Sequence, residues 1–411
     1  MGQIRVLIVD DSAFMRHALG RLLAEAPDLD VVGTACNGDE GLRLAAALRP
    51  DVITLDVEMP LLDGLGMLKR LMLETPTRVI MLSNRTTENA RTTLDALEYG
   101  AIDFVPKPSG SLAIDIGRVG DDLVSKIRAA AGMSEAGFLR HRQVAAMNLT
   151  LVNYQARQTA ATAQATETAG QSGPDPKLRA LPAPVPAISG KEPRGPRAAA
   201  RKLVVIASST GGPSALQAVV RGLPADLGAA VAIVQHMAPG FTTSLAARLD
   251  SVGPLPCSEA ARNDLLVGDA ILVAPGDFHM ISSTSGRIQL VRLPAVNGVR
   301  PSADVTLQAV APIWRERLLC VVLTGMGCDA RDGARAAKQH GGTVISQDAA
   351  TSTIYGMPAA VVEAGLTDQV MPLHQIAAGI VAWCRMEQSA KSARESGSRL
   401  DGRPNRSALA S

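Results

Sequence analysis

Short apolar runs alternate with amphipathic segments twice along this chain, and a stretch with neither pattern separates the two series. In the first series each run is followed by a segment in which apolar positions recur at helical spacing, the last at Asp121–Ala131. The runs predict strands at Val6–Val9, Val31–Thr34, Val52–Leu55, Val79–Leu82 and Asp103–Val105. Five βα units over residues 1–132 predict a doubly wound parallel sheet.

The second series fills residues 202–386 and predicts a second α/β domain. Its apolar runs are Leu203–Ile206, Val231–Gln235, Ala270–Ala274, Leu318–Thr324 and Thr343–Ser346. A hairpin-like pair lies around Met280–Thr284 and Arg287–Arg292. We therefore expect a mostly parallel sheet with an antiparallel excursion.

The segment between the two series, residues 133–201, predicts a flexible linker. Residues 158–200 are rich in Ala, Thr, Gln and Pro and contain seven prolines, so they bury too little apolar surface to offset their ordering entropy. The pattern at Met133–Arg157 is partly helical, and it leaves open whether this part extends the preceding helix or packs on it. Residues 387–411 predict a disordered tail.

Composition excludes several classes of protein. The formal net charge is +2 and the chain has only two Trp, three Tyr and five Phe, which argues against nucleic-acid binding. The five cysteines form no C-x-x-C pair, so neither a zinc site nor a disulfide framework is indicated, and a reducing, cytoplasmic location fits best. No apolar stretch is long enough for membrane insertion, and the start of the chain does not look like a signal peptide.

Charged and hydroxyl side chains follow the predicted strands of the first domain. In doubly wound sheets function collects at the carboxyl ends of the strands, and these ends carry Asp10, Asp11, Asp56, Ser83 and Lys107. Three adjacent carboxylates repel one another unless a hard cation such as Mg²⁺ neutralises them. The pattern predicts a phosphoryl-transfer site in which Asp56 is the acceptor.

The strand ends of the second domain carry a different set. A serine, a histidine and an aspartate follow three separate strands, which is the arrangement a nucleophile, its base and the orienting carboxylate require. Spacing alone does not separate Ser208 from Ser209, and the same residues also suit a helix cap. His279 rivals His236 as the base, and the carboxylates that compete with Asp329 are Asp304, Asp332 and Asp348. Gly211-Gly212 and G-M-G at Gly325–Gly327 leave room for substrate and free backbone N–H groups for the developing oxyanion.

The first domain resembles the receiver domain of two-component response regulators. The resemblance rests on V-L-I-V-D-D-S at Val6–Ser12, L-D-V-E-M-P at Leu55–Pro60, D-G at Asp63-Gly64 and K-P at Lys107-Pro108. It implies a flavodoxin-like (βα)5 fold in which Asp56 accepts the phosphoryl group. By position, it also implies Mg²⁺ binding by Asp10, Asp11, Asp56 and the backbone carbonyl of Glu58, a switch hydroxyl at Ser83, a conserved-role lysine at Lys107 and a reorienting aromatic at Tyr99.

The second domain resembles the catalytic domain of chemotaxis protein-glutamate methylesterases. The motifs are I-A-S-S-T-G-G at Ile206–Gly212, Q-H-M-A-P-G-F-T at Gln235–Thr242, A-P-G-D-F-H-M at Ala274–Met280, P-S-A-D-V at Pro301–Val305, L-T-G-M-G-C-D at Leu323–Asp329 and Y-G-M-P at Tyr355–Pro358. The resemblance implies Ser209 as nucleophile, His236 as base and Asp329 as its orienter, with support from Thr210 and the Met326 N–H. The chain departs from the family at Ala330, where Gly is usual, at Ala238, where Pro is common, and at Ser83–Thr86.

Together the two resemblances imply a phosphorylation-activated hydrolase of the cytoplasm. It would demethylate glutamate γ-methyl esters on chemoreceptors, release methanol and deamidate particular glutamines. The implied partners are methyl-accepting chemoreceptors as substrate and a chemotaxis histidine kinase as phosphodonor; we expect a monomer that binds no nucleic acid. Mg²⁺ would serve phosphorylation only, and ester hydrolysis would need no cofactor.

We also expect the receiver domain to cover the entrance to the triad, so that deleting residues 1 to about 200 raises basal activity. Three alternatives are a DNA-binding effector, an idle adaptor that competes for phosphoryl groups, and an esterase of small molecules.

Overall fold

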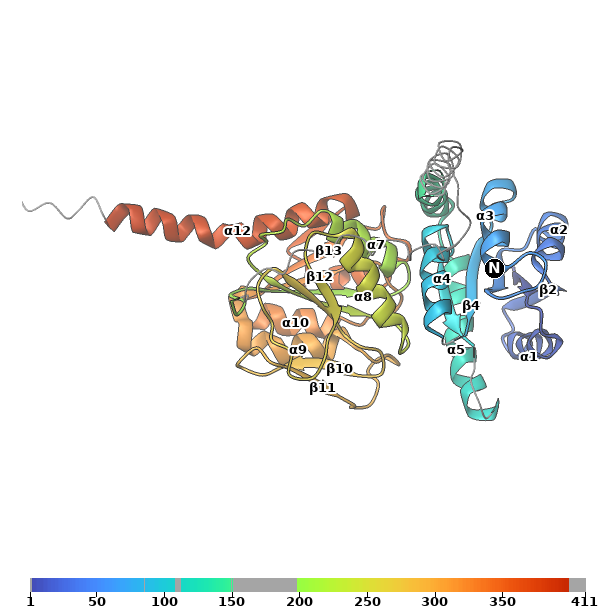
Figure 1. The fold of residues 1–411 in the computed structure, drawn as a ribbon, viewed down its shortest axis with the longest axis horizontal. Coiled ribbons are helices and arrows are strands. Elements are labelled where there is room, and N and C mark those ends of the chain that lie inside the picture. Colours follow the sequence, from blue (N-terminus) through green and yellow to red (C-terminus); the bar gives the residue numbers. More distant parts are fainter. Residues whose placement is uncertain (1, 85, 108–111, 149, 151–197, 399–411) are drawn as a thin grey trace, which may run out of the picture.

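The protein folds into two α/β domains that pack against each other through helices, as the computed structural model shows (Figure 1). The structure describes residues 2–84, 86–107, 112–148, 150 and 198–398. Most of the segment predicted as a linker, the end of the predicted tail and Pro108 of the K-P motif lie outside these residues.

The first domain is a five-stranded parallel sheet with strand order β2-β1-β3-β4-β5. Local signals set its helix starts: Ser12, Asn37, Asp63 and Thr86 each accept a hydrogen bond from a backbone N–H in the first turn of the following helix. The elements are β1 Ile4–Val9, α1 Ala13–Ala24, β2 Leu29–Ala35, α2 Gly38–Leu48, β3 Val52–Asp56, α3 Gly64–Glu74, β4 Arg78–Ser83, α4 Thr87–Glu98, β5 Asp103–Pro106 and α5 Leu112–Ala131. The predicted flavodoxin-like fold is confirmed.

The second domain is built on a seven-stranded sheet with strand order β14-β13-β12-β6-β7-β9-β8. Strands β6 and β7 at its centre are buried along their whole length, which explains why they read as continuous apolar runs. The elements are β6 Leu203–Ser208, α7 Gly212–Arg221, β7 Ala230–Gln235, α8 Phe241–Val252, β8 Cys257–Glu259, β9 Ala270–Val273, β10 His279–Ser282, β11 Ile288–Val291, α9 Ala303–Trp314, a 3₁₀ turn Arg315–Arg317, β12 Leu318–Val322, α10 Arg331–Gln339, β13 Thr343–Gln347, α11 Met357–Glu363, β14 Gln369–Met371 and α12 Leu373–Ser398.

The antiparallel hairpin is present but lies outside the main sheet. Among the described residues, strands β10 and β11 form a sheet of their own, and the neighbouring strands of the seven-stranded sheet all pair in parallel. Two edge strands, β8 and β14, were not predicted, because runs of three residues carry too little pattern to be recognised.

Two segments predicted to be flexible contain helix. Residues 135–148 are helical, and Phe138 packs in the receiver core while the His141 ring nitrogen Nε2 lies 3.1 Å from the carbonyl oxygen of Gly100. Helix α12 continues to Ser398, into the predicted disordered tail, because Ala, Glu, Gln, Lys and Arg dominate that stretch and favour helix. Each segment thus includes helix next to its neighbouring domain, and the flexibility of the linker and of the tail stays a prediction.

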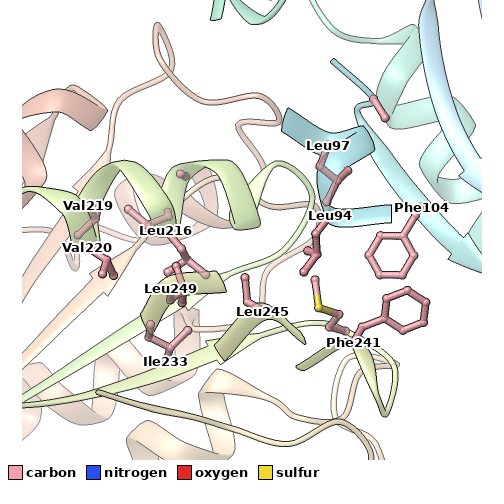
Figure 2. Packing of buried hydrophobic residues seen from close by; sticks show 14 of the residues in the cluster. Leu94, Leu97, Phe104, Leu216, Val219, Val220, Ile233, Phe241, Leu245 and Leu249 are labelled. Carbon is pink, nitrogen blue, oxygen red and sulfur yellow. The ribbon is translucent and has the colours of Figure 1, made fainter. Parts of the chain in front are cut away.

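The two domains share one apolar core across their contact. Leu94 and Leu97 of α4 and Phe104 of β5 face Leu216, Phe241 and Leu245 of α7 and α8 (Figure 2). The rings of Phe104 and Phe241 lie 4.5 Å apart between centroids. At the rim of this apolar contact, Arg248 of α8 pairs with Asp95 and Glu98 of α4. No helix in the described part of the chain has the length and hydropathy to cross a membrane.

Candidate functional site

The turn after β6 presents one accessible hydroxyl. Ser208, the last residue of the strand, is fully buried, and its Oγ donates a 2.7 Å hydrogen bond to Gln235 Oε1. Ser209 begins the turn and is partly exposed, while its backbone N–H donates to the Thr324 carbonyl at 3.0 Å. The turn closes at Gly211 with φ of 77°, a conformation that glycine adopts without strain. The fold therefore exposes Ser209, a distinction that spacing alone did not make.

His236 and Asp329 meet beside this turn. Strands β12, β6 and β7 are neighbours in the sheet, so the loops that follow them lie together. His236 Nε2 lies 2.7 Å from Asp329 Oδ2, which leaves Nδ1 of the ring as the free nitrogen. Both side chains are largely buried, at 9% and 2% exposure. Among the described residues, no hydrogen bond joins the Ser209 hydroxyl to His236; catalytic bonds of this kind often tighten only when substrate binds.

Asp329 is held in its charged form by the start of helix α9. The Ser302 hydroxyl and the Ala303 N–H donate to its two oxygens at 2.7 Å and 2.6 Å. Burial by itself would raise the pKa of Asp329, but hydrogen bonds from His236 and Ser302 outweigh it and lower the pKa to about 2. A carboxylate that is ionised and fixed in this way can orient an imidazole and stabilise its protonated form.

The rival base and the rival acids are occupied elsewhere. His279 is fully buried, its Nδ1 accepts from the Ser302 N–H, and its Nε2 lies 3.1 Å from the Pro294 carbonyl, so neither nitrogen is free to act. The competing carboxylates bind N–H or guanidinium groups in loops and at helix starts: Asp304 with Gly333, Asp332 with Arg335, and Asp348 with Thr351.

Thr210 follows Ser209 in the chain, and Met326 follows Gly325, where a Cβ would lie 2.8 Å from Ser209 Cβ. The Thr210 Oγ1 donates to Asp103 Oδ2 of the receiver domain at 2.5 Å, so its hydroxyl is not free in this arrangement. The backbone N–H of Met326 donates no backbone hydrogen bond within the described part of the chain, which leaves it available to an oxyanion. Sequence reasoning did not find Asp103, because a buried acid at a strand start carries no pattern until its partner in another domain is known.

Close approach at Gly325 shapes the turn that carries Ser209. A Cβ at this position would lie 2.4 Å from Met357 Sδ and 2.8 Å from Ser209 Cβ, distances at which side chains must shift. The glycines of G-M-G were expected to leave room for substrate. At Gly325 the missing side chain instead makes room for Ser209 and Met357, which occupy the space that a Cβ would need.

A second cluster lies at the strand ends of the receiver domain. One carboxylate oxygen from each of Asp10, Asp11 and Asp56 lies within 4.8 Å of the others. The Lys107 ammonium is 2.8 Å from Asp10 and 2.7 Å from Asp56. Burial raises the pKa of Asp56 to about 6, and the nearby ammonium only partly offsets this effect. One lysine cannot neutralise three acids, so the residues fit a hard divalent cation with oxygen ligands such as Mg²⁺.

Ser83 links this cluster to the helix that contacts the second domain. It is fully buried, and its Oγ lies 2.8 Å from the Oγ1 of Thr93 in α4. Tyr99, at the end of the same helix, is also buried, with the Lys69 ammonium 4.5 Å from its ring centroid. The Glu58 carboxylate accepts from Asn84, and the role expected for the Glu58 carbonyl stays a prediction.

Comparison with known proteins matches both halves of the chain. Residues 204–380 match the family model described as CheB methylesterase, and residues 6–114 match the response regulator receiver domain. The protein-glutamate methylesterase/protein-glutamine glutaminase of Symbiobacterium thermophilum is 45% identical over 377 residues, which cover 92% of this chain and 96% of that relative. The chain belongs to the CheB methylesterase family.

A second relative agrees with this assignment. The protein of the same description from Thermotoga maritima is 39% identical over 376 residues, covering 91% of this chain and 96% of that protein. The crystal structure of the Thermotoga maritima CheB methylesterase catalytic domain is 41% identical, covers 44% of this chain and 97% of that one, and has a TM-score of 0.43.

Ala330, at a position where the resemblance led us to expect glycine, has an unusual backbone conformation. Its φ is 79°, and it is the N-cap residue of α10, directly after Asp329. An alanine in this left-handed conformation costs about 1–2 kcal/mol. Its methyl group is fully buried, which returns part of that cost.

Proposed function

We propose that this CheB protein is a phosphorylation-activated hydrolase that removes methyl groups from glutamate γ-methyl esters of chemoreceptors, releases methanol and deamidates specific glutamines. The observation that carries the proposal is the pairing of His236 with Asp329 at strand ends that neighbour the partly exposed Ser209. The names of the relatives, protein-glutamate methylesterase/protein-glutamine glutaminase, supply the substrate class. We further propose that the protein acts in the cytoplasm as a monomer.

In the proposed mechanism Ser209 is the nucleophile. Its Oγ forms a bond to the ester carbonyl carbon while Nδ1 of His236 takes the hydroxyl proton, and Asp329 stabilises the imidazolium. The Met326 N–H, and the Thr210 hydroxyl once it is released, donate to the oxyanion of the tetrahedral intermediate.

Collapse of this intermediate breaks the bond to the methoxy oxygen, which leaves as methanol with the proton from the imidazolium. Water then attacks the acyl-enzyme by the same route and frees the glutamate. With a glutamine substrate the leaving group is ammonia.

We propose that the receiver domain inhibits the triad in the unphosphorylated protein. Asp103 of the receiver accepts a hydrogen bond from the Thr210 hydroxyl. Phe104 of the receiver packs on Phe241 at the start of α8, a few residues after His236. A long linker does not by itself hold the two domains together, so an inhibitory interface must supply its own binding energy. These contacts supply part of that energy.

Phosphorylation of Asp56 is the proposed trigger. Mg²⁺, held by Asp10, Asp11, Asp56 and the Glu58 carbonyl, would neutralise the acids while a histidine kinase supplies the phosphoryl group. Ser83 and Lys107 would then bind that group. The Ser83–Thr93 contact offers a route to α4 and so to the interface, as a shift between two domain arrangements.

The decisive test is methanol release from a methylated receptor fragment, with acetyl phosphate and Mg²⁺ present. Ser209→Ala should abolish release while phosphorylation of Asp56 stays intact, which controls for folding of the receiver. A fluorophosphonate should label Ser209 and not Ser208, as peptide mass spectrometry would show. Near-wild-type methanol release by Ser209→Ala would disprove the assignment. Turnover of small-molecule esters without turnover of methylated receptor would favour a general esterase instead.

A further inference from the structure

Gln235, the last residue of β7, is a buried amide with three hydrogen bonds to the catalytic turns. Its side chain is 2% exposed, and its Oε1 accepts from the Ser208 hydroxyl at 2.7 Å. Its Nε2 donates to the backbone carbonyls of Ser209 at 2.9 Å and of His236 at 3.1 Å. An amide nitrogen has two N–H groups, so both donors are used on the two residues proposed as nucleophile and base.

The nucleophile turn is built around this amide. A Cβ at Gly212 would lie 2.0 Å from Gln235 Oε1, so only glycine lets the turn approach so closely. The backbone N–H of Ser209 is held by the Thr324 carbonyl on one side, and its carbonyl by Gln235 on the other. The peptide units on both sides of the Ser209 Cα are thereby fixed, which limits where its hydroxyl can point.

We infer that Gln235 is a positioning residue that sets the separation and mutual orientation of the Ser209 hydroxyl and the His236 ring. The inference rests on the proposed function, in which these two side chains react together. Both acceptors of its two N–H groups belong to the residues proposed to react, so the amide ties the two turns to each other. Displacement of a reacting group by about 1 Å costs on the order of 100-fold in rate, so a loss of this tie should be large.

The chemistry of the site selects an amide of this length. Methionine has a similar volume but no donor, so the His236 carbonyl would lose the Gln235 amide and the Ser209 carbonyl would keep only the Gly212 N–H, which is 2.7 Å away. A carboxylate would place a negative oxygen against two carbonyl oxygens, and only its protonated form could donate to one of them. Asparagine is shorter by one methylene and would not span the two turns.

The test compares Gln235→Met with Gln217→Met in the full-length protein, activated with acetyl phosphate and Mg²⁺. Gln217 is the matched control, because it is 4% exposed on α7 and its amide accepts from Arg221 rather than from either catalytic turn. Two rates are measured: methanol release from methylated receptor, and labelling of Ser209 by a fluorophosphonate. Thermal unfolding of each variant reports folding.

For Gln235→Met we expect kcat and the labelling rate to fall by about 100-fold, with KM within about twofold of wild type. Gln217→Met should keep both rates. Gln235→Glu guards against misfolding of the methionine variant: its kcat relative to wild type should rise as the pH is lowered, because protonation of the introduced carboxyl restores one donor.

Three results would overturn the inference. They are wild-type kcat and labelling in folded Gln235→Met, a rise in KM with unchanged kcat, and an equal loss in Gln217→Met. The labelling rate needs no receptor, so it decides the role of Gln235 even if the wild-type protein releases no methanol. A wild-type protein that releases no methanol would contradict the proposed function but not the role of Gln235.

Discussion

Replacing Asp103 with alanine should switch on the esterase without phosphorylation. Asp103 is 8% exposed and is the residue through which the receiver holds the Thr210 hydroxyl, at 2.5 Å. Its second partner, Lys126, is not left unpaired by the change, because it also donates to the Phe104 carbonyl at 2.7 Å and pairs with Asp122 at 3.3 Å. Within the receiver, the substitution also removes the bond that the Phe104 N–H donates to Asp103 Oδ1 at 2.8 Å, so Asp103→Ala takes away one interdomain bond and one local bond.

The expected magnitude follows from burial. A buried hydrogen bond to a charged group contributes about 1.5–3 kcal/mol, which corresponds to a shift of roughly 10- to 150-fold between closed and open arrangements. The Arg248–Asp95 pair spans the same interface at 3.2 Å, but its side chains are 32% and 37% exposed. Pairs of that kind contribute about 0.2–1 kcal/mol, so Asp95→Ala should raise basal activity by only about 1.4- to 5-fold.

The assay is methanol release by full-length protein without phosphodonor, followed by the same measurement after full phosphorylation. Without phosphodonor, methanol release by Asp103→Ala should be faster than by Asp95→Ala, and both variants should be faster than the wild type. After phosphorylation all three should converge, because the open arrangement is the same. Basal activity of Asp103→Ala equal to wild type, or below Asp95→Ala, would refute the view that this contact inhibits the enzyme.

Three further predictions address the phosphorylation site, the nucleophile turn and the link between the domains. The pKa of Asp56 is raised from 3.8 to about 6, so ionising this carboxyl group destabilises the fold. The stability that its protonated form contributes is fully present below about pH 4 and is lost as the pH rises through about 6. Asp56→Asn should therefore raise receiver stability by about 3 kcal/mol at neutral pH, seen by calorimetry, and the gain should vanish toward pH 4; a constant gain would contradict this. Gly325→Ala should lower methanol release by about 100-fold with phosphorylation unchanged, since its methyl group would displace Ser209; wild-type turnover would show that the turn adapts. Thr93→Val, which frees the Ser83 hydroxyl from a bond of about 0.5–1.5 kcal/mol, should lower the acetyl phosphate concentration for half-maximal activation by about 2- to 10-fold; an unchanged concentration would exclude this link.

Patterns local in the sequence predicted most of the fold and most of the candidate residues. Apolar runs identified the strands, and the strand-end rule then brought together Asp10, Asp11 and Asp56, and separately His236 and Asp329, because parallel strands end at the same edge of a sheet. Short edge strands escaped prediction, and helix-forming residues in the predicted linker and tail were underestimated.

The sequence by itself determined which chemistry the chain carries, since motif residues and their strand positions are local properties. Only the tertiary structure decided which of two adjacent serines is exposed and which histidine keeps a free nitrogen. The same holds for the contact of Asp103 with Thr210 and for the amide of Gln235 between the turns of Ser209 and His236. These depend on burial and on partners distant in the chain, and burial and partnership are fixed only when the sheets and the two domains pack together.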